Sequence, residues 1–360
     1  LTAYKKEDIN KCYYWTYKNS LKGINMNKPP EEFVRVEEDR LMDFGVACFK
    51  QSGLDEDHAT LFTRLLVNCD LRGVRSHGSR NFSGYCSAFE TKSANPRPNI
   101  RVVQETPATA VLDGDGTLGY WPMVKASEYA VKKAKAVGVG MVTVRPIGHY
   151  GSAGHYTRIC MEQGCIGFSV QGYIGQGDAG AAEEKPQIGY YGNPPISFAI
   201  PGNEEPPVVL DAATSIMADY QRGPEFDAML PQIPAAFFKS IGYTAIASLL
   251  GGGLTGFTLP EFEAVRQQWP SAQMGGMVLA INIGSVVDEA VFGAEVDRMV
   301  SDVRDTYAPM PGYDRALLPG GIEEEKMAQY RREGIPYGEP EQDSARQVAK
   351  RLSVPLPWEE

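Results

Sequence analysis

The chain has 360 residues, of which 43% are hydrophobic and 22% charged, and its formal net charge at pH 7 is −10. Its 38 glycines and 25 prolines exceed ordinary usage but stay below the low-complexity range. This excludes collagen-like and disordered proteins and predicts about two domains. The acidic balance argues against nucleic acid as a partner. No apolar run approaches the roughly 18 residues of a membrane span, so no membrane partner is expected.

The six cysteines are spread along the chain and form no CxxC pair. This distribution is typical of buried free thiols in a reducing compartment, and not of a disulfide framework or a zinc site. The first residues also lack the apolar core of a signal peptide. A cytoplasmic protein is therefore expected. No metal site is expected either, because His149 and His155 lie six residues apart and form no HExxH helix.

Residues 1–31 are polar and aromatic and close with a helix-breaking Pro-Pro pair, which predicts an N-terminal arm. Beyond the arm, apolar residues recur at steps of mostly three to five positions as far as Cys48. This spacing predicts a first helix that takes in Phe33 and stops at Gly53.

Asp55 or Asp57 can cap a second helix, whose apolar stripe extends from Ala59 to Cys69. His58 lies in its first turn and is expected to be solvated. The elements expected after this helix are strands at 100–103 and 108–112, a helix from 122 to a stop at 138, a strand at 141–144, a helix at 153–162, strands at 166–170, 196–200 and 208–210, a helix at 239–250, a strand at 277–281, and helices at 294–305, 323–332 and 344–352.

Helices gather at both ends of the chain and strands in its middle. This order predicts an α/β fold with a mixed sheet, flanked by a helical domain formed from both termini. The expected division is an arm at 1–31, a mainly helical domain from 32–100 with 306–360, and a mixed α/β domain at 101–305. The glycines of 172–177 lack GxGxxG spacing, so the sheet domain is expected to be of a non-Rossmann type. Neither a P-loop nor a GxSxG elbow occurs.

Two of the four histidines lie in settings typical of a functional site. His77 follows a predicted helix, among glycine, basic and hydroxyl residues, which suits a site loop better than a core. His149 follows a buried strand in a glycine-flanked turn before a helix, where α/β proteins place catalytic groups and bind anions. The alternatives are a surface histidine in a charged turn for His77 and a structural cap for His149. His155 is expected to be a packing or surface residue.

Several short motifs occur in one order along the chain. They are Asp70 to Gly78 (DLRGVRSHG) with Tyr85, Asp113-Gly114 with Leu118-Gly119, His149 to Gly154 (HYGSAG), Gly192-Asn193-Pro194, Leu210 to Ser215 (LDAATS), Pro234 to Lys239, Leu318-Pro319-Gly320 and Gly334-Ile335. In this order they are highly specific. From about Val34 to about Tyr337 the chain resembles the malate/L-lactate dehydrogenase family that is distinct from the Rossmann-type lactate dehydrogenases.

The resemblance implies a nicotinamide-dependent oxidoreductase, a homodimer with its active site between domains, and a small carboxylate substrate. Such enzymes interconvert a 2-hydroxy acid and a 2-oxo acid or, in some members, an amino acid and a cyclic imine acid. Proton transfer is assigned to the position of His77 in some members and to that of His149 in others, and both are kept as candidates. Ser76 and Tyr85 match substrate-pocket positions, and Arg80 is a further candidate there.

The resemblance also implies cofactor contacts along Leu210 to Ile216, at Lys239 and at Pro319 and Gly320. The residues themselves are compatible with this. Thr214 and Ser215 follow an apolar strand, where hydroxyls and backbone N–H groups can meet a ribose or phosphate. Asp211 can serve the same ribose or cap the turn. Lys239 opens a largely apolar helix, so it pairs with a phosphate or is a snorkelling surface lysine. The sequence does not distinguish NAD from NADP.

Three positions depart from the family pattern. The arginine expected four residues after the motif histidine is replaced by Asn81, and the arginine present is Arg80, although a guanidinium fork is what grips a carboxylate. The stretch from Ser215 to Lys239 is shorter than the family's by roughly 25 residues, more than ordinary loop variation. Ser240 stands where the family prefers glycine. These changes affect the expected substrate pocket and cofactor site.

The leading prediction is an NAD(P)-dependent dehydrogenase or reductase. The first alternative is a lyase or isomerase that uses the same histidines without redox chemistry on a degenerate dehydrogenase scaffold. The second is a binding or regulatory protein descended from such enzymes.

Overall fold

The computed structural model describes residues 27, 29–172, 193–217, 223–310 and 313–359. Most of the predicted arm, the glycines after residue 172, Gly192 of its motif and part of the shortened segment therefore lie outside the described residues. The helices and strands, in chain order, are β1 (Val34–Val36), α2 (Glu38–Gln51), α3 (Glu56–Leu71), α4 (Phe82–Glu90), β2 (Arg101–Glu105), β3 (Thr109–Asp113), α5 (Tyr120–Val137), β4 (Val139–Ile147), α6 (Gly154–Met161), β5 (Cys165–Gly172), β6 (Pro195–Ile200), β7 (Val208–Ala213), α7 (Pro224–Met229), α8 (Pro234–Gly251), α9 (Glu263–Gln268), β8 (Met274–Asn282), α10 (Glu289–Thr306), α11 (Gly321–Glu333), β9 (Ile335–Tyr337) and α12 (Glu339–Leu352).

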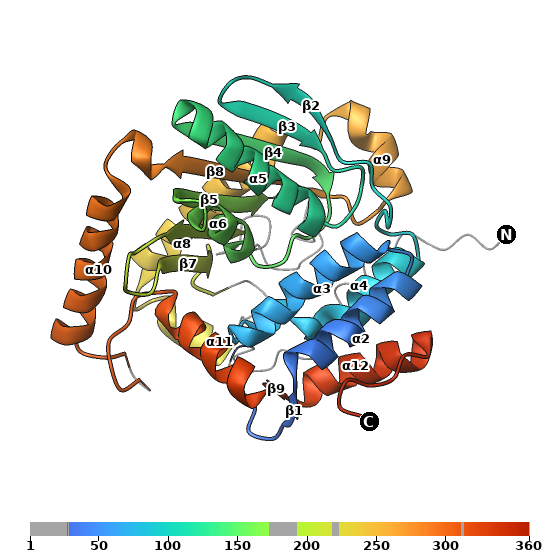
Figure 1. The fold of residues 1–360 in the computed structure, drawn as a ribbon. Coiled ribbons are helices and arrows are strands. Elements are labelled where there is room, and N and C mark those ends of the chain that lie inside the picture. Colours follow the sequence, from blue (N-terminus) through green and yellow to red (C-terminus); the bar gives the residue numbers. More distant parts are fainter. Residues whose placement is uncertain (1–26, 28, 173–192, 218–222, 311–312, 360) are drawn as a thin grey trace.

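A seven-stranded sheet forms the centre of the α/β part, in the order β2-β3-β4-β8-β5-β6-β7 (Figure 1). β3 and β4 run parallel, and the other neighbours run antiparallel. The sheet is therefore mixed and lacks the parallel doubly wound order of a Rossmann domain. The predicted fold class is confirmed.

Helices cover both faces of this sheet. α5 and α6 lie on one face, and a Cβ added at Gly140 of β4 would come within 2.1 Å of a backbone oxygen of α5, so only glycine allows this approach. α8 lies on the other face, where Ala247 packs against Val170 and Met277. Each expected strand and helix after residue 54 overlaps an observed element of the same type, whereas α4, α7, α9 and β9 were not predicted.

The helical part is assembled from both ends of the chain. α2, α3 and α4 contact one another or α12, and Figure 1 shows the last helix beside the first ones. The expected first helix was wrong at its start, because Val34–Val36 forms β1 and pairs with Ile335–Tyr337. The helix begins only at Glu38, since Glu37 has an extended backbone. The residue bounds given above for two domains stay a prediction.

His58 contradicts its prediction as a solvated residue. Its side chain is 0% exposed, with its ring 4.6 Å from that of Trp121 and 6.2 Å from that of Phe89. Asp55 caps the helix as predicted, by accepting a hydrogen bond from the backbone N–H of His58. The first turn of α3 is covered by α4 and α5, a contact that helix periodicity does not report. Burial lowers the pKa of His58 to about 4.

We expect His58→Phe to make the stability of the protein less sensitive to acid. A histidine with a lowered folded pKa stabilises the fold fully above pH 6.5, and this contribution is lost as the pH falls toward 4. The loss between pH 7 and pH 4 is roughly 3 kcal/mol for this group. Urea unfolding at both pH values measures it. Phe89→Leu is the control, which lowers stability at both pH values equally. An unchanged pH dependence in His58→Phe would contradict the prediction.

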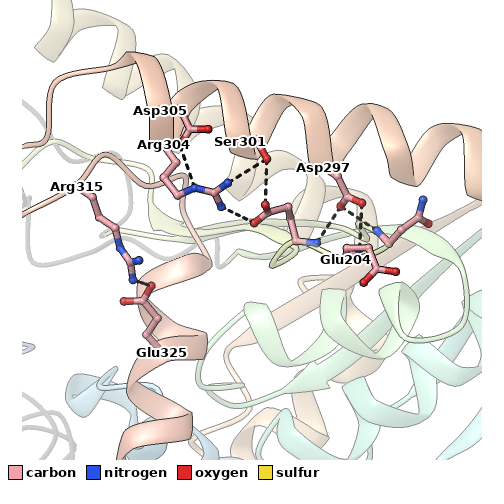
Figure 2. Close-up of polar contacts among 9 residues, drawn as sticks. Glu204, Asp297, Ser301, Arg304, Asp305, Arg315 and Glu325 are labelled. Carbon is pink, nitrogen blue, oxygen red and sulfur yellow. Dashed lines mark hydrogen bonds and ion pairs between the residues drawn. The ribbon is translucent and has the colours of Figure 1, made fainter.

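α10 anchors the loop that leads into β7 (Figure 2). The carboxylate of Asp297 accepts hydrogen bonds from the backbone N–H groups of Asn203, Glu204 and Glu205, at 3.0, 3.0 and 3.1 Å. Arg304 binds the side chain of Glu205 at 2.7 Å, and this pairing lowers the pKa of Glu205. The loop is thus held at its backbone and at a side chain, which fixes where β7 enters the sheet.

Five of the six cysteines belong to the described residues, and all five are buried free thiols, as expected. Within the described ranges, none of the helices combines the length and apolar character needed to cross a membrane. In the same ranges, no group of three or more histidine, cysteine, aspartate or glutamate residues is arranged to hold a metal ion.

Candidate active site

The turn that carries His149 is fixed by the loop after the neighbouring strand. β3 and β4 are parallel, so the segments that follow them leave the same edge of the sheet. The backbone N–H of Gly119 donates to the carbonyl of His149 at 3.0 Å, and that of Gly148 donates to the carbonyl of Thr117 at 2.8 Å. A Cβ at Gly119 would come within 2.5 Å of Tyr150. The Leu118-Gly119 motif therefore shapes the histidine turn.

The buried carboxylate of Asp70 fixes the loop that carries His77. Asp70 accepts a hydrogen bond from the backbone N–H of Ser79 at 2.9 Å, and a Cβ at Gly78 would lie 1.9 Å from its Oδ1. Burial raises the pKa of Asp70 to about 7, although its hydrogen bonds to Ser79 oppose this. The motif glycine is required because the carboxylate fills the space of a side chain.

The loop is also tied to the C-terminal helix. Arg75, two residues before His77, pairs with Glu341 of α12, whose side chain is 1% exposed. The hydroxyl of Tyr337 in β9 donates to that of Ser79. The position of His77 therefore depends on residues more than 250 positions away in the chain.

The two predicted catalytic histidines lie face to face. Their ring centroids are 5.7 Å apart, with 25° between the planes. Each Nδ1 has a hydroxyl partner at 2.9 Å, which is Ser76 Oγ for His77 and Tyr85 Oη for His149. The structure thus brings together the two histidines and two of the expected substrate-pocket residues from α4, the η1 turn (Arg75–His77) and the end of β4.

Burial lowers the pKa of both histidines. Burial and, to a smaller extent, the neighbouring His77 together lower the pKa of His149 to about 3. Burial also lowers the pKa of His77, but the negative charge of Asp211 opposes that shift. His77 is therefore the histidine of the pair whose protonated form receives electrostatic support.

Asp211 lies within β7 and holds the turn that follows His149. Its carboxylate on β7 accepts hydrogen bonds from the hydroxyl of Ser152 and from the backbone N–H of Gly154, the latter at 2.9 Å. These residues lie at the start of α6, so Asp211 joins β7 to the turn after His149. Leu210 beside it is 39% exposed.

The hydroxyls of Thr214 and Ser215 are buried and engaged within the protein. Thr214 donates to the carbonyl of Pro194 at 2.8 Å, and the Ser215 hydroxyl lies 3.2 Å from that of Thr244 in α8. They hold the end of β7 to neighbouring segments.

Pro319 and Gly320 lie against β7. The backbone N–H of Val209 donates to the carbonyl of Pro319 at 2.8 Å. Gly320 has φ +106°, and a Cβ there would lie 2.6 Å from the carbonyl oxygen of Pro207. Two segments expected to bind cofactor, far apart in sequence, are therefore adjacent in space.

Lys239 and Arg80 carry charges that no described residue neutralises. Lys239 is exposed on α8, which begins at Pro234, so the lysine does not open the helix as predicted. Arg80 is half-buried in the η2 turn (Ser79–Asn81). Neither side chain makes a hydrogen bond or ion pair with any other part of the chain that the structure describes.

Asn81, which replaces the family's arginine, is used to hold the loop. Its side-chain amide donates to the carbonyl oxygens of Ser76 and Gly78, both at 3.0 Å. An asparagine amide held in this way does not make the bidentate contact that an arginine guanidinium makes with a carboxylate.

Sequence reasoning missed three residues that shape the site. Tyr120 binds Tyr85 behind His149, and its signal was its position directly after the Leu118-Gly119 motif. Asp70 opened a motif but was given no role. Gln171 of β5 bonds to both sides of the histidine turn, by accepting from the N–H of Tyr150 at 3.1 Å and donating to the carbonyl of Gly148 at 3.0 Å. No local pattern marks it.

Residues 36–222 and 225–344 match the family model described as malate/L-lactate dehydrogenase. The chain belongs to this family. It is therefore an oxidoreductase of the malate/L-lactate dehydrogenase family. The interruption of the match, between residues 222 and 225, falls within the segment that the sequence predicts to be shortened.

Curated members of the family resemble the chain over most of its length. L-sulfolactate dehydrogenase of Methanocaldococcus jannaschii is 31% identical over 78% of this chain and 86% of its own. Malate dehydrogenase of Pyrococcus horikoshii is 27% identical over 90% of this chain and 97% of its own. Ureidoglycolate dehydrogenase (NAD(+)) of Escherichia coli O157:H7 is 26% identical over 79% of this chain and 87% of its own.

Solved structures of the family share the fold. The Pyrococcus horikoshii malate dehydrogenase has a TM-score of 0.76 at 24% identity, covering 93% of this chain and 99% of that one. The Methanocaldococcus jannaschii sulfolactate dehydrogenase has a TM-score of 0.71 at 27% identity, covering 89% of this chain and 98% of that one. The family fold is therefore preserved in this member despite its sequence departures.

Proposed function

We propose that this family member is an NAD(P)-dependent dehydrogenase that interconverts a small 2-hydroxy acid and 2-oxo acid, or an amino acid and a cyclic imine acid. The observation that carries the proposal is the pair of stacked histidines, each with a hydroxyl partner, in a chain of this family. Reduction of a carbonyl requires a proton at its oxygen, and a histidine at His77 or His149 supplies it.

The described residues include an exposed cation, Lys239, that suits an anionic dinucleotide. Lys239 is an exposed cation on an otherwise apolar helix, and it has no counter-ion among the described residues. We propose that it pairs with a cofactor phosphate, and that backbone groups along Leu210–Ser215 and Pro319-Gly320 contact the remainder of the cofactor. The nicotinamide, when bound, supplies or accepts the hydride.

We propose that Arg80 holds the substrate carboxylate, in place of the arginine that the family has one position later. Its guanidinium is half-buried and has no partner in the described part of the chain, whereas Asn81 is engaged with its own loop. Ser76 and Tyr85 then orient the carbonyl beside the two histidines. A substitution of this kind moves the carboxylate anchor and thereby selects a different 2-oxo acid.

The expected result of a cofactor titration is a fluorescence change with NADH or NADPH, followed by cofactor oxidation when a panel of 2-oxo acids is added. Lys239→Met weakens binding of the cofactor, and Arg80→Lys raises KM for the acid, since a lysine cannot form the bidentate contact. Glu295→Gln, on an exposed face of α10, is the control. The absence of binding at millimolar cofactor would contradict the proposal, as would turnover without nicotinamide.

A cytoplasmic homodimer is part of the same proposal. The buried free thiols are in keeping with a reducing compartment. One face of α8 remains apolar and exposed, with Phe238 at 77%, Ile246 at 52% and Leu249 at 62% exposure. A second copy of the chain is the partner that the family resemblance implies for such a surface.

A further inference from the structure

A cavity of about 510 Å³ lies between α3, α5 and α6, and neither of the stacked histidines lines it. Its wall includes two arginines, Arg72 at the end of α3 and Arg158 on α6. The apolar part of the wall consists of Leu65, Val124, Val131 and Ile159. An apolar wall with a few charged groups is the usual composition of a small-molecule site. The sign of the two charges selects an anionic ligand.

The two arginines share the carboxylate of Glu324 in α11. Nε of Arg72 lies 3.5 Å and Nε of Arg158 lies 3.7 Å from its Oε1, beyond the roughly 2.7–3.2 Å of a hydrogen bond. The arginine side chains are 15% and 10% exposed, whereas that of Glu324 is 32% exposed. Burial and the charge of Arg72 lower the pKa of Arg158, and Glu324 opposes this only in part. Two largely buried positive charges therefore face one partly exposed negative charge.

The hydrogen-bond donors of both guanidinium groups are unused. Neither group donates a hydrogen bond to any residue that the structure describes, and both Nε atoms are buried. Two further carboxylates lie near Arg158, but each is engaged elsewhere. Asp211 accepts hydrogen bonds from Ser152 and Gly154, and Glu323 accepts one from the backbone N–H of Gly320 at 3.1 Å. Buried donors without acceptors are costly, so the site favours an added oxyanion.

The remaining titratable residues of the cavity wall do not change this balance. The three charged ones are exposed, so water and salt screen their charges; they are Arg64, Glu128 and Glu162. His155 also lines the cavity. Burial and the charges of Arg72 and Arg158 lower the pKa of His155 well below its usual value, so its ring adds no positive charge near pH 7. The charge that a ligand meets inside the cavity is therefore that of the two arginines and Glu324.

We propose that Arg72 and Arg158 bind the oxyanion of a small amphipathic molecule, a carboxylate or a phosphate, whose apolar part lies against the apolar wall of the cavity. A guanidinium presents paired N–H donors that match two oxygens of either group. This site is additional to Arg80 and Lys239, which are proposed above for the substrate carboxylate and the cofactor phosphate. An oxyanion held by both arginines connects the end of α3 to α6.

Thermal unfolding of the full chain, after dialysis into chloride buffer, tests the site with two probes at constant ionic strength. The probes are inorganic phosphate and hexanoate, a carboxylate with an apolar chain. We expect at least one of them, at about 50 mM, to raise Tm by roughly 2–5 °C, as a ligand with a Kd on the order of 1 mM does. The probe with the larger shift identifies the oxyanion that the arginines prefer.

Variants of Arg158 separate a binding site from a structural ion pair. Arg158→Met removes the shift, and Arg158→Lys weakens binding by roughly tenfold, because a lysine lacks the paired donors. Without added anion, Arg158→Met unfolds at the same or a higher temperature than the unmodified protein, since Arg72 and Glu324 then form a balanced pair. A structural ion pair predicts a lower temperature. Arg64→Met is the matched control, because it replaces an exposed arginine of the same cavity and keeps the shift.

The absence of a shift with both probes would overturn the inference, as would a lower Tm of Arg158→Met in chloride alone. A shift that persists in Arg158→Met but is lost in Arg80→Lys or Lys239→Met would assign the anion to the substrate or cofactor site, and would equally overturn it. Because unfolding needs neither nicotinamide nor a 2-oxo acid, failure of the proposed dehydrogenase activity is distinguished from failure of this binding site.

Discussion

Replacement of His77 by glutamine lowers kcat by about 10²- to 10⁴-fold, the range that general acid–base catalysis contributes. Glutamine can hydrogen-bond in the same space but cannot exchange a proton near neutral pH. His149→Gln has a smaller effect, because the charge of Asp211 favours the protonated form of His77. Steady-state kinetics with the acid found in the panel measures both variants. His58→Phe keeps the rate of the unmodified protein, because that histidine lies in the aromatic core.

The order of the two losses tests which histidine transfers the proton. A larger loss in His149→Gln than in His77→Gln would assign proton transfer to His149 and contradict the prediction. Activity retained in both variants would place the chemistry elsewhere. Thermal unfolding of each variant shows whether a loss of rate comes from a loss of fold.

Replacement of Glu341 by leucine lowers the free energy of unfolding by about 3–5 kcal/mol, as expected when one member of a buried ion pair is removed. Its side chain is 1% exposed, and that of Arg75 is 12% exposed, so the remaining guanidinium loses its carboxylate in a site largely closed to water. Urea unfolding measures the change. Because Arg75 lies in the turn of His77, we also expect a reduced kcat.

An exposed ion pair provides the control for this effect. Glu295 and Arg298 on α10 are 58% and 57% exposed, and Glu295→Gln changes stability by less than about 1 kcal/mol. The double variant Arg75→Met with Glu341→Leu recovers part of the loss, since the guanidinium that loses its buried carboxylate is then removed as well. A loss in Glu341→Leu no larger than that in Glu295→Gln would contradict a structural role for the buried pair.

Local signals account for the parts of the fold that the sequence predicted correctly. The Asp55 cap and the Gly138 stop are read from the residues at the two helix ends, and the structure shows a side-chain cap at one and φ +92° at the other. The middle strands follow from apolar runs bounded by turns. Both histidines were identified because motifs of fixed order place them after secondary-structure elements, and the comparisons confirm the family that those motifs indicated.

Contacts between distant residues account for what was missed. β1 consists of three residues and forms only because β9, about 300 positions later, pairs with it. Burial of His58 depends on α4 and α5 covering the first turn of α3. Such features have no periodicity in the sequence, because they depend on which surfaces meet after the elements form.

The sequence by itself determined the family and the order of most elements, and it marked the two histidines as candidates, since these depend on residue types at short and regular spacing. Only the tertiary structure decided that the rings of those histidines stack, that Asp211 caps a turn, and that Tyr120 stands behind His149. Hydrogen-bond direction, burial and charge are properties of neighbours in space, and neighbours of this site come from α3, α4, α5, β4, β7 and α12.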